Sequence, residues 1–575
     1  MRILLAILFD LVEILFHGTQ NLLKGWGLKG EEVAWVAFRL GGDPPYRRQG
    51  LVRRRLGARR GNPEWEPDLE TFGERLEAVA GARGTRGVVL RLESLELGRA
   101  KAHALAGTLR AFRESSGKEV VVWAAALEGP ALALGLAADR ILVAPAGRVG
   151  VKGAALEVTT ARRALEKLGA SAVVVRRGTH KAAGEVLTED GISEAYRETL
   201  DGLLDDGHAH ALARLQEGRG VDAEVAASWI DRGPYTAADA LDEGLIDGIC
   251  YGDEVADHLE RAGAPRPKLR PWPAFAASQT RPLRLRPILT ARPHVAVLSL
   301  RGLIVEGESR PLPGGSRTVG DRTVAEALAE LRKDERVKAI VLRIDSRGGS
   351  AHASDLIWHE VKRTAEKKPV IAWMENVAAS GGYYIAAAAH EILAAPLCLT
   401  GSIGVIASLF DLSGVYERLG LRRELLARGD LAALGTTSRA PTEEELAHLD
   451  HQVGQLYQVF KERVAAGRGL ELEEVEAVAQ GRVFTSERAK EHRLIDRVGG
   501  FESAVDAARR RAGIAGEFEL DFREPLPSGL MGLLPGMELR EAWLPGDAFL
   551  LDWAHLAARA PGALWAVELL EPPGR

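Results

Sequence analysis

Ser380 and Lys181 are the two side chains in this sequence whose surroundings favour covalent catalysis. Ser380 follows the apolar run 369–373 through a turn of small residues and begins a stretch that we expect to be helical. Its hydroxyl would then lie beside unpaired backbone N–H groups at the positive end of the helix dipole. Such a serine becomes a nucleophile only when a neighbouring base removes its proton.

Lys181 would be that base if it is buried. A lysine of ordinary pKa, about 10.4, is protonated at neutral pH. Burial lowers the pKa toward about 7–8, where the neutral amine accepts a proton. Lysine is scarce, at 15 of the 75 Lys and Arg residues. The simpler alternatives are that Ser380 is a helix N-cap and that Lys181 is a solvated surface lysine.

Two glycine-containing turns would supply an oxyanion hole. The sequence IDSRGGS (344–350) ends a predicted strand with two glycines, which let backbone N–H groups point at an anion. The N–H groups of Gly349 and Gly381 are therefore the predicted donors to the oxygen of a tetrahedral intermediate.

The elements that must position these residues occur twice, because the chain contains two copies of a domain of about 250 residues. The run GVVLRLES (87–94) matches AIVLRIDS (339–346). From Pro145 and Pro396 through Gly178 and Gly429, a constant offset of 251 relates each residue of the first copy to its counterpart in the second.

Each copy lacks the candidate catalytic residue that the other copy holds. Ser380 of the second copy corresponds to Gly129, and Lys181 of the first copy corresponds to Ala432. The glycine pair of the second copy has no counterpart in the first. The hypothesis that follows is a Ser–Lys dyad assembled from both copies.

The fold class predicted for both copies is α/β. Short β-rich runs alternate with helical patterns such as 322–337, which predicts crossover connections and a buried, mainly parallel sheet with flanking helices. The expected segments are an N-terminal amphipathic or membrane-anchor helix (1–30), a first domain that supplies the lysine (31–262), a proline-rich linker (263–293), a second domain that supplies the serine and the oxyanion hole (294–515), and an apolar C-terminal tail (516–575).

Composition narrows the class of protein. With 46% hydrophobic residues, the 575-residue chain is neither disordered nor fibrous. Its net charge of −5 gives no reason to expect nucleic-acid binding. Cys250 and Cys398 are too few for a disulfide framework, and we expect buried thiols.

Residues 4–17 are apolar but interrupted by Asp10 and Glu13, a pattern that favours an amphipathic helix at a membrane surface.

Four motifs together carry a family resemblance. In SRGGS (346–350), ENVAASGGYYIA (375–386), TGSIG (400–404) and GTHKAAGE (178–185), the sequence resembles the signal peptide peptidase A family in its long tandem-domain form. The resemblance covers about 31–515 and implies two Clp-protease/crotonase-like domains. It implies a serine endopeptidase that acts on remnant signal peptides. We expect no cofactor and no metal.

The resemblance also assigns roles to residues. It places the nucleophile on Ser380 and the general base on Lys181, and it implies that Ser402 hydrogen-bonds the lysine amine. Gly349 and Gly381 would form the oxyanion hole. The implied assembly is a bowl-shaped homotetramer at the bacterial inner membrane, although the short N-terminal segment also allows a soluble form.

Two positions depart from the family pattern. Arg347 stands where the family usually has proline, and His180 stands where it usually has tyrosine. His180 is an alternative base to Lys181, because histidine is the commonest general base. We favour the lysine, since no acidic residue is obviously placed to orient the histidine.

Other functions stay open at this point. His448 with His451, and His352 with His359 and Glu360, have the spacing of metal ligands but no evident further ligand. A crotonase-like acyl-CoA enzyme would use the same oxyanion hole without a Ser–Lys dyad. A catalytically silent membrane-associated scaffold would use neither the oxyanion hole nor the dyad.

Overall fold

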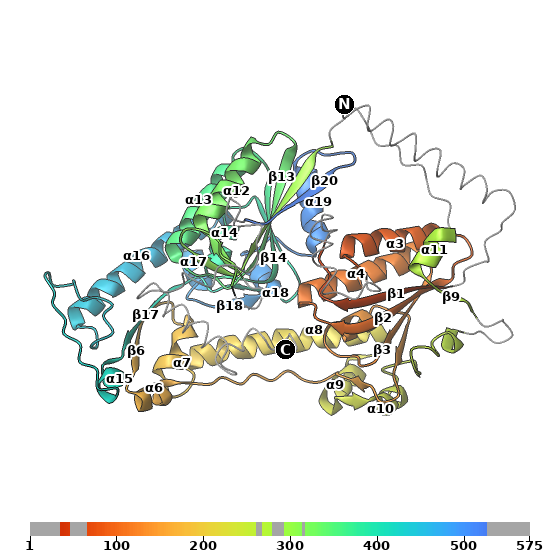
Figure 1. Ribbon diagram of the computed structural model, residues 1–575, viewed down its shortest axis with the longest axis horizontal. Coiled ribbons are helices and arrows are strands. Elements are labelled where there is room, and N and C mark those ends of the chain that lie inside the picture. Colours follow the sequence, from red (N-terminus) through yellow and green to blue (C-terminus); the bar gives the residue numbers. More distant parts are fainter. Residues whose placement is uncertain (1–34, 47–65, 260–266, 279–291, 313–316, 526–575) are drawn as a thin grey trace. The chain divides into compact units, whose positions relative to one another are not determined.

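The computed structural model describes residues 35–46, 66–259, 267–278, 292–312 and 317–525 (Figure 1). The helix expected over 1–30 lies outside these ranges, and so does most of the expected tail 516–575. In the ranges described, no helix is both long enough and apolar enough to cross a membrane.

The chain folds as two compact units. The described residues up to 153 and from 208 to 278 belong to the first unit, and those of 154–207 and from 292 onward belong to the second. The segment 154–207 is part of the first sequence copy, but it folds with the second copy. Lys181 and Ser380 therefore belong to one compact unit. The helix α8 (Glu194–Arg219) runs from the second unit into the first.

The first unit is built on a six-stranded parallel sheet with the order β8-β4-β3-β2-β1-β9. Its central strands are almost continuous in Val and Leu and are buried, as parallel strands covered on both faces must be. The elements of this unit are β1 (Trp35–Gly42), α3 (Leu69–Gly81), β2 (Gly87–Leu95), α4 (Arg99–Ser116), β3 (Glu119–Ala124), α5 (Pro130–Gly135), β4 (Arg140–Val143), β5 (Arg148–Val149), α9 (Ala223–Arg232), β7 (Tyr235–Thr236), α10 (Ala237–Asp242), β8 (Gly248–Ile249), β9 (Leu269–Pro271) and α11 (Trp272–Ser278).

Part of the segment expected to be an extended linker forms regular structure instead. Strand β9 pairs with β1 at the edge of the first sheet, and Phe275 of the following helix α11 is fully buried. An edge strand tolerates Pro271 because the side facing away from the sheet needs no N–H donor. Pro273 fits near the start of a helix, where the N–H groups have no partner in the helix.

The second unit contains the larger sheet, with the order β18-β16-β14-β13-β10-β20; β15 and β19 extend it from β14. All pairs are parallel except β16 with β18. Its elements are α6 (Arg162–Leu168), β6 (Ser171–Arg177), α7 (Glu185–Thr188), β10 (His294–Arg301), β11 (Leu303–Val305), β12 (Thr318–Gly320), α12 (Asp321–Lys333), β13 (Val337–Ser346), α13 (Ala351–Ala365), β14 (Val370–Ala379), α14 (Gly381–Ala386), β15 (Glu391–Ala394), β16 (Leu399–Gly401), β17 (Val405–Asp411), α15 (Ser413–Arg418), α16 (Glu443–Arg468), α17 (Leu472–Val478), β18 (Val483–Thr485), α18 (Ser486–Glu491), β19 (Arg497–Val498), α19 (Phe501–Arg511) and β20 (Glu519–Arg523).

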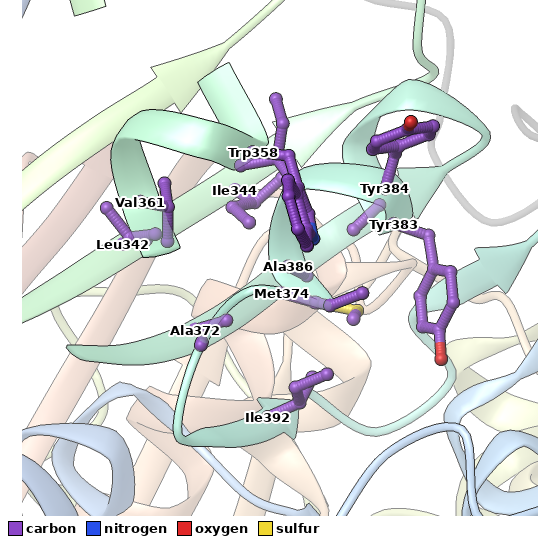
Figure 2. Close-up of a cluster of buried hydrophobic side chains, with 14 of the residues drawn as sticks. Leu342, Ile344, Trp358, Val361, Ala372, Met374, Tyr383, Tyr384, Ala386 and Ile392 are labelled. Carbon is purple, nitrogen blue, oxygen red and sulfur yellow. The ribbon is translucent and has the colours of Figure 1, made fainter. Parts of the chain in front are cut away.

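One continuous apolar core supports β13 and β14, and Ser380 lies in the turn that follows β14. Figure 2 shows part of it, where side chains of β13 and β14 pack with Trp358 of α13 and with Tyr384 of α14. Ile344 and Met374 have no exposed surface. This packing fixes the ends of β13 and β14, from which the two glycine-containing turns begin.

The two sheets share one strand order. Strands β9, β1, β2, β3, β4 and β8 of the first unit correspond in sequence and in pairing to β20, β10, β13, β14, β15 and β19 of the second. The predicted α/β class, with a mainly parallel sheet and flanking helices in each copy, is confirmed.

Candidate active site

Ser380 lies in the turn between β14 and α14 with a backbone φ of 54° and ψ of −118°. Glycine is nearly the only residue that adopts these angles without strain. Gly129, its counterpart in the first copy, has φ 47° and ψ −119° at the start of α5. The backbone of the turn is thus the same in both copies, and the second copy holds a serine where the first has a glycine.

Lys181 points its amine at this serine. Its Nζ atom lies 3.1 Å from Ser380 Oγ and 2.8 Å from both Oγ and the carbonyl oxygen of Ser402. The residue is only 6% exposed, and burial lowers the pKa of its amine to about 7. Near neutral pH, a large fraction of the amine is therefore uncharged and able to accept a proton. The structure brings all three predicted side chains together.

A loop that the sequence analysis did not single out fixes the backbone of Lys181. The N–H of His180 donates to the carbonyl of Gln480 at 2.7 Å, and the N–H of Gly481 donates to the carbonyl of Ile403 at 2.8 Å. A Cβ atom at Gly481 would lie 2.5 Å from the Lys181 nitrogen, so only glycine allows this approach. In the sequence alone, Gly481 was the only residue of this loop that could have indicated a close backbone contact.

The glycine pair at the end of β13 lies against the serine turn. Gly348 has a φ of 102°, and a Cβ there would lie 2.8 Å from the nitrogen of Gly381 and 2.9 Å from Ser380 Cβ. Ser346 holds this turn, because its Oγ donates to the Gly302 carbonyl and accepts from the Gly348 N–H. The absence of a side chain at Gly348 thus leaves space beside the candidate nucleophile.

The amide of Gly349 is turned away from its neighbouring strand. The N–H of Ile304 donates to the Gly348 carbonyl, and the N–H of Ser350 donates to the Ile304 carbonyl, each at 2.9 Å. In this parallel bridge, the N–H of Gly349 points away from Ile304. Gly381 is the first residue of α14, so its N–H has no acceptor within the helix. Neither the bridge nor the helix therefore supplies an acceptor for these two N–H groups.

His180 has an acidic neighbour that the sequence analysis did not find. Its Nε2 lies 3.2 Å from the Glu198 carboxylate on α8, and its Nδ1 lies 3.0 Å from Thr179 Oγ1. The two ring nitrogens face these groups, whereas the lysine amine contacts Ser380. The earlier expectation that no carboxylate is placed to orient His180 was wrong, because a partner on a helix turn 18 residues away leaves no local pattern.

A buried polar cluster lies behind the turn. Glu375 accepts two hydrogen bonds of 2.8 Å from Arg343, and both residues are buried. Asp345 accepts from the N–H of Val377 at 3.2 Å. Burial, with the nearby Glu375 carboxylate, raises the pKa of Asp345 to about 6. These paired charges anchor the ends of β13 and β14 to each other.

Other candidate groups take positions away from the dyad. Tyr383 and Tyr384 donate to the Leu494 carbonyl and to Asp355 respectively. Cys250 and Cys398 are buried and make no disulfide. Within the part of the chain that the structure describes, no group of three or more His, Cys, Asp or Glu side chains could hold a metal ion.

Comparison with known proteins identifies the family. The model of peptidase family S49 matches residues 112–264 and again residues 362–515. The chain belongs to peptidase family S49. The double match agrees with the internal repeat, and the predictions of the family and of a serine-type peptidase are confirmed at this level.

Named relatives agree with this assignment. The chain is 34% identical to "Serine protease SPPA, chloroplastic" of Arabidopsis thaliana over 74% of this chain and 63% of that protein. It is 29% identical to "Protease 4" of Salmonella typhi over 85% of this chain and 79% of that protein. It is 30% identical to "Putative signal peptide peptidase SppA" of Enterococcus faecium over 40% of this chain and 67% of that protein. The match thus spans less than two thirds of the Arabidopsis relative.

Among solved structures, a ClpP1 variant from Listeria monocytogenes aligns with 36% of this chain at 14% identity and a TM-score of 0.24. None of the named relatives favours an acyl-CoA enzyme or a silent scaffold.

Proposed function

We propose that this S49 family member is an endopeptidase that hydrolyses apolar peptides, such as cleaved signal peptides, with Ser380 as the nucleophile and Lys181 as the general base. The observation that carries the proposal is the 3.1 Å contact between Lys181 Nζ and Ser380 Oγ, made by a buried amine whose pKa lies near 7. Ser402 supports it, because its two oxygens hold the amine beside the nucleophile.

The proposed reaction proceeds in two halves. In the first, neutral Lys181 takes the hydroxyl proton while Ser380 Oγ bonds to the scissile carbonyl carbon. The N–H groups of Gly349 and Gly381 stabilise the resulting oxyanion. The lysine ammonium then gives its proton to the leaving amine, and the C–N bond breaks. In the second half, Lys181 takes a proton from water as the water attacks the acyl-enzyme, and it returns the proton to Ser380 Oγ as the ester bond breaks.

Side-chain replacement tests this mechanism on a fluorogenic apolar peptide. We expect Ser380→Ala and Lys181→Ala each to lose at least about a thousandfold in kcat/KM. Lys181→Arg should fail equally, because a guanidinium stays protonated and cannot act as a base. The exposed Lys367 is a matched control, and Lys367→Ala should retain full activity. An active Lys181→Ala enzyme would refute the dyad.

We further propose that the chain associates with a membrane through residues 1–30 and assembles as a homo-oligomer, with a tetramer and the bacterial inner membrane as the specific expectations. The alternation of apolar residues with Asp10 and Glu13 supports interfacial binding. The test is sedimentation with anionic vesicles. The full chain should pellet, and a variant that lacks residues 1–30 should stay in the supernatant.

A further inference from the structure

Arg347 is the first residue after β13, and it directly precedes the glycine pair beside the candidate nucleophile. On one side of it, Ser346 Oγ donates to the Gly302 carbonyl at 2.6 Å and accepts from the Gly348 N–H at 3.1 Å. On the other side, a Cβ at Gly348 would lie 2.9 Å from Ser380 Cβ. The backbone of Arg347 is therefore held close to the turn that carries Ser380.

The positive charge of Arg347 is not compensated by the protein. The residue is exposed, and within the ranges that the structure describes its guanidinium makes no hydrogen bond, ion pair or ring contact. The arginines behind the turn differ from it. Arg343 makes two hydrogen bonds of 2.8 Å with Glu375, and Arg301 lies 3.5 Å from the carboxylate of Asp345. The acidic groups at the ends of β13 and β14 are thus already paired.

The carboxylates on the other side of the turn have different partners. Glu306 accepts a hydrogen bond from Ser350 Oγ at 3.1 Å. Asp355 accepts one from Arg463 Nε at 3.0 Å. A free guanidinium beside a candidate active site favours a carboxylate ligand, because its fork of N–H donors matches the two carboxylate oxygens.

This arginine belongs to the copy that holds the nucleophile. At the corresponding position the first copy has Leu95, the last residue of β2, which packs partly buried against the core of the first unit. The glycine pair that follows Arg347 is also missing there, since Glu96 and Leu97 replace it. The first copy therefore has neither the turn nor the charge.

The turn brings the charge within reach of a bound peptide. Arg347 precedes Gly349, the proposed oxyanion donor, by two residues, so their Cα atoms lie at most about 7 Å apart. A stem of three methylene groups carries the guanidinium beyond this distance. An extended peptide advances about 3.3–3.4 Å per residue, so the residues within reach are about three on either side of the scissile bond.

We propose that Arg347 binds a carboxylate of the peptide substrate within about three residues of the scissile bond. The carboxylate belongs to an Asp or Glu side chain or to the C-terminus of the peptide, and both offer the same two oxygens to the guanidinium. The inference rests on the proposed peptidase function, because it names a substrate feature that the same site recognises.

Paired fluorogenic peptides test the proposal on the full-length protein. In one set, an apolar peptide carries Glu or Gln at a single position near the cleaved bond. In the second set, the same peptide ends in a free or an amidated C-terminus. The wild-type protein should cleave the charged member of one pair with about tenfold higher kcat/KM, mainly through a lower KM. High salt should reduce this preference. The set that shows it identifies the source of the carboxylate.

Substitutions of Arg347 then assign the preference to this side chain. Arg347→Gln should abolish it, and Arg347→Glu should reverse it, so that Lys is preferred to Glu at the same peptide position. Arg83 is a matched control, because it is also exposed and precedes a glycine of positive φ, Gly84, in a turn of the first unit. Arg83→Gln should keep the wild-type preference.

The outcomes separate this inference from the proposed function. The inference is overturned if the wild-type protein cleaves both members of every pair equally, or if Arg347→Gln keeps the preference; loss of cleavage in Ser380→Ala would still uphold the peptidase. An equal fall of kcat for all peptides in Arg347→Gln would also overturn it, because the arginine would then act on the oxyanion. If Ser380→Ala still cleaves the peptides, the peptidase mechanism fails and this inference fails with it.

Discussion

Because the backbone at Ser380 is strained, we predict that the Ser380→Gly variant is more stable than the Ser380→Ala variant. Such a preference for glycine is unusual at a candidate catalytic residue. The φ of 54° and ψ of −118° are shared with Gly129 of the first copy. Holding a residue with a Cβ in such a conformation costs about 1–3 kcal/mol. Glycine adds backbone entropy to the unfolded chain worth about 0.5–1 kcal/mol.

The difference between these terms favours glycine by about 1 kcal/mol. Ser380→Gly and Ser380→Ala both remove the hydroxyl and its contact with Lys181, so the comparison between them isolates the backbone. Both variants should be inactive. Urea unfolding followed by circular dichroism measures the free energy of unfolding of each.

Two substitutions control this measurement. Ala447→Gly, on the exposed surface of α16, should destabilise by about 1 kcal/mol, the ordinary penalty for glycine in a helix. Gly129→Ala should destabilise the first unit, because it introduces the strain that Ser380 now carries. If Ser380→Gly unfolds at the same or a lower urea concentration than Ser380→Ala, the strain argument is wrong.

Three further predictions concern the base, the turn and the support of the lysine. Burial lowers the pKa of Lys181 from 10.5 to about 7, so the unfolded chain binds more protons between these values and stability should rise with pH across that window, by up to about 1.4 kcal/mol per pH unit. Lys181→Met should abolish this rise of stability with pH. If the unfolding midpoint changes by the same amount between pH 7.5 and pH 9.5 in the wild-type protein and in Lys181→Met, the prediction is contradicted. Gly348→Ala should lower kcat by about a hundredfold or more, because its Cβ would lie 2.8 Å from the Gly381 nitrogen, whereas Gly307→Ala, with φ +83° and nothing within 4 Å, should keep its activity. Ser402→Ala should lower kcat by about fivefold to tenfold with little change in KM, as expected for the loss of one hydrogen bond to the amine; an unchanged kcat would remove Ser402 from the site.

The sequence was sufficient for the α/β class, the repeat and the pairing of the dyad residues. Alternating strand and helix patterns carry the fold. The constant offset of 251 shows directly that Ser380 replaces Gly129 and that Lys181 has no counterpart at Ala432. The comparison between copies thus supplied information that neither copy holds alone.

The supporting contacts were beyond the reach of the sequence. The loop of Gln480 and Gly481 touches His180 and Lys181 from about 300 positions away, and no local periodicity encodes so distant a contact. Glu198 escaped notice for a similar reason, since one glutamate on a polar helix has no distinguishing pattern.

Two aspects of chain organisation also needed the structure. The prolines of 263–293 predicted extended chain, but an edge strand and the first turn of a helix also accept proline, as β9 and α11 do. Residues 154–207 lie in the first sequence copy, yet they fold with the second unit. An internal repeat identifies segments of common origin. Which segments fold together into one compact unit depends instead on which strands pair.

The most direct test of the account is the rate at which a fluorophosphonate labels Ser380, followed by intact-protein mass spectrometry from pH 5 to 9. If neutral Lys181 activates the serine, the labelling rate should rise with pH through a midpoint near 7 and then level off, and Lys181→Ala should label at least about a hundredfold more slowly at pH 8. A rate that is independent of pH, or that is unaffected in Lys181→Ala, would contradict the central claim.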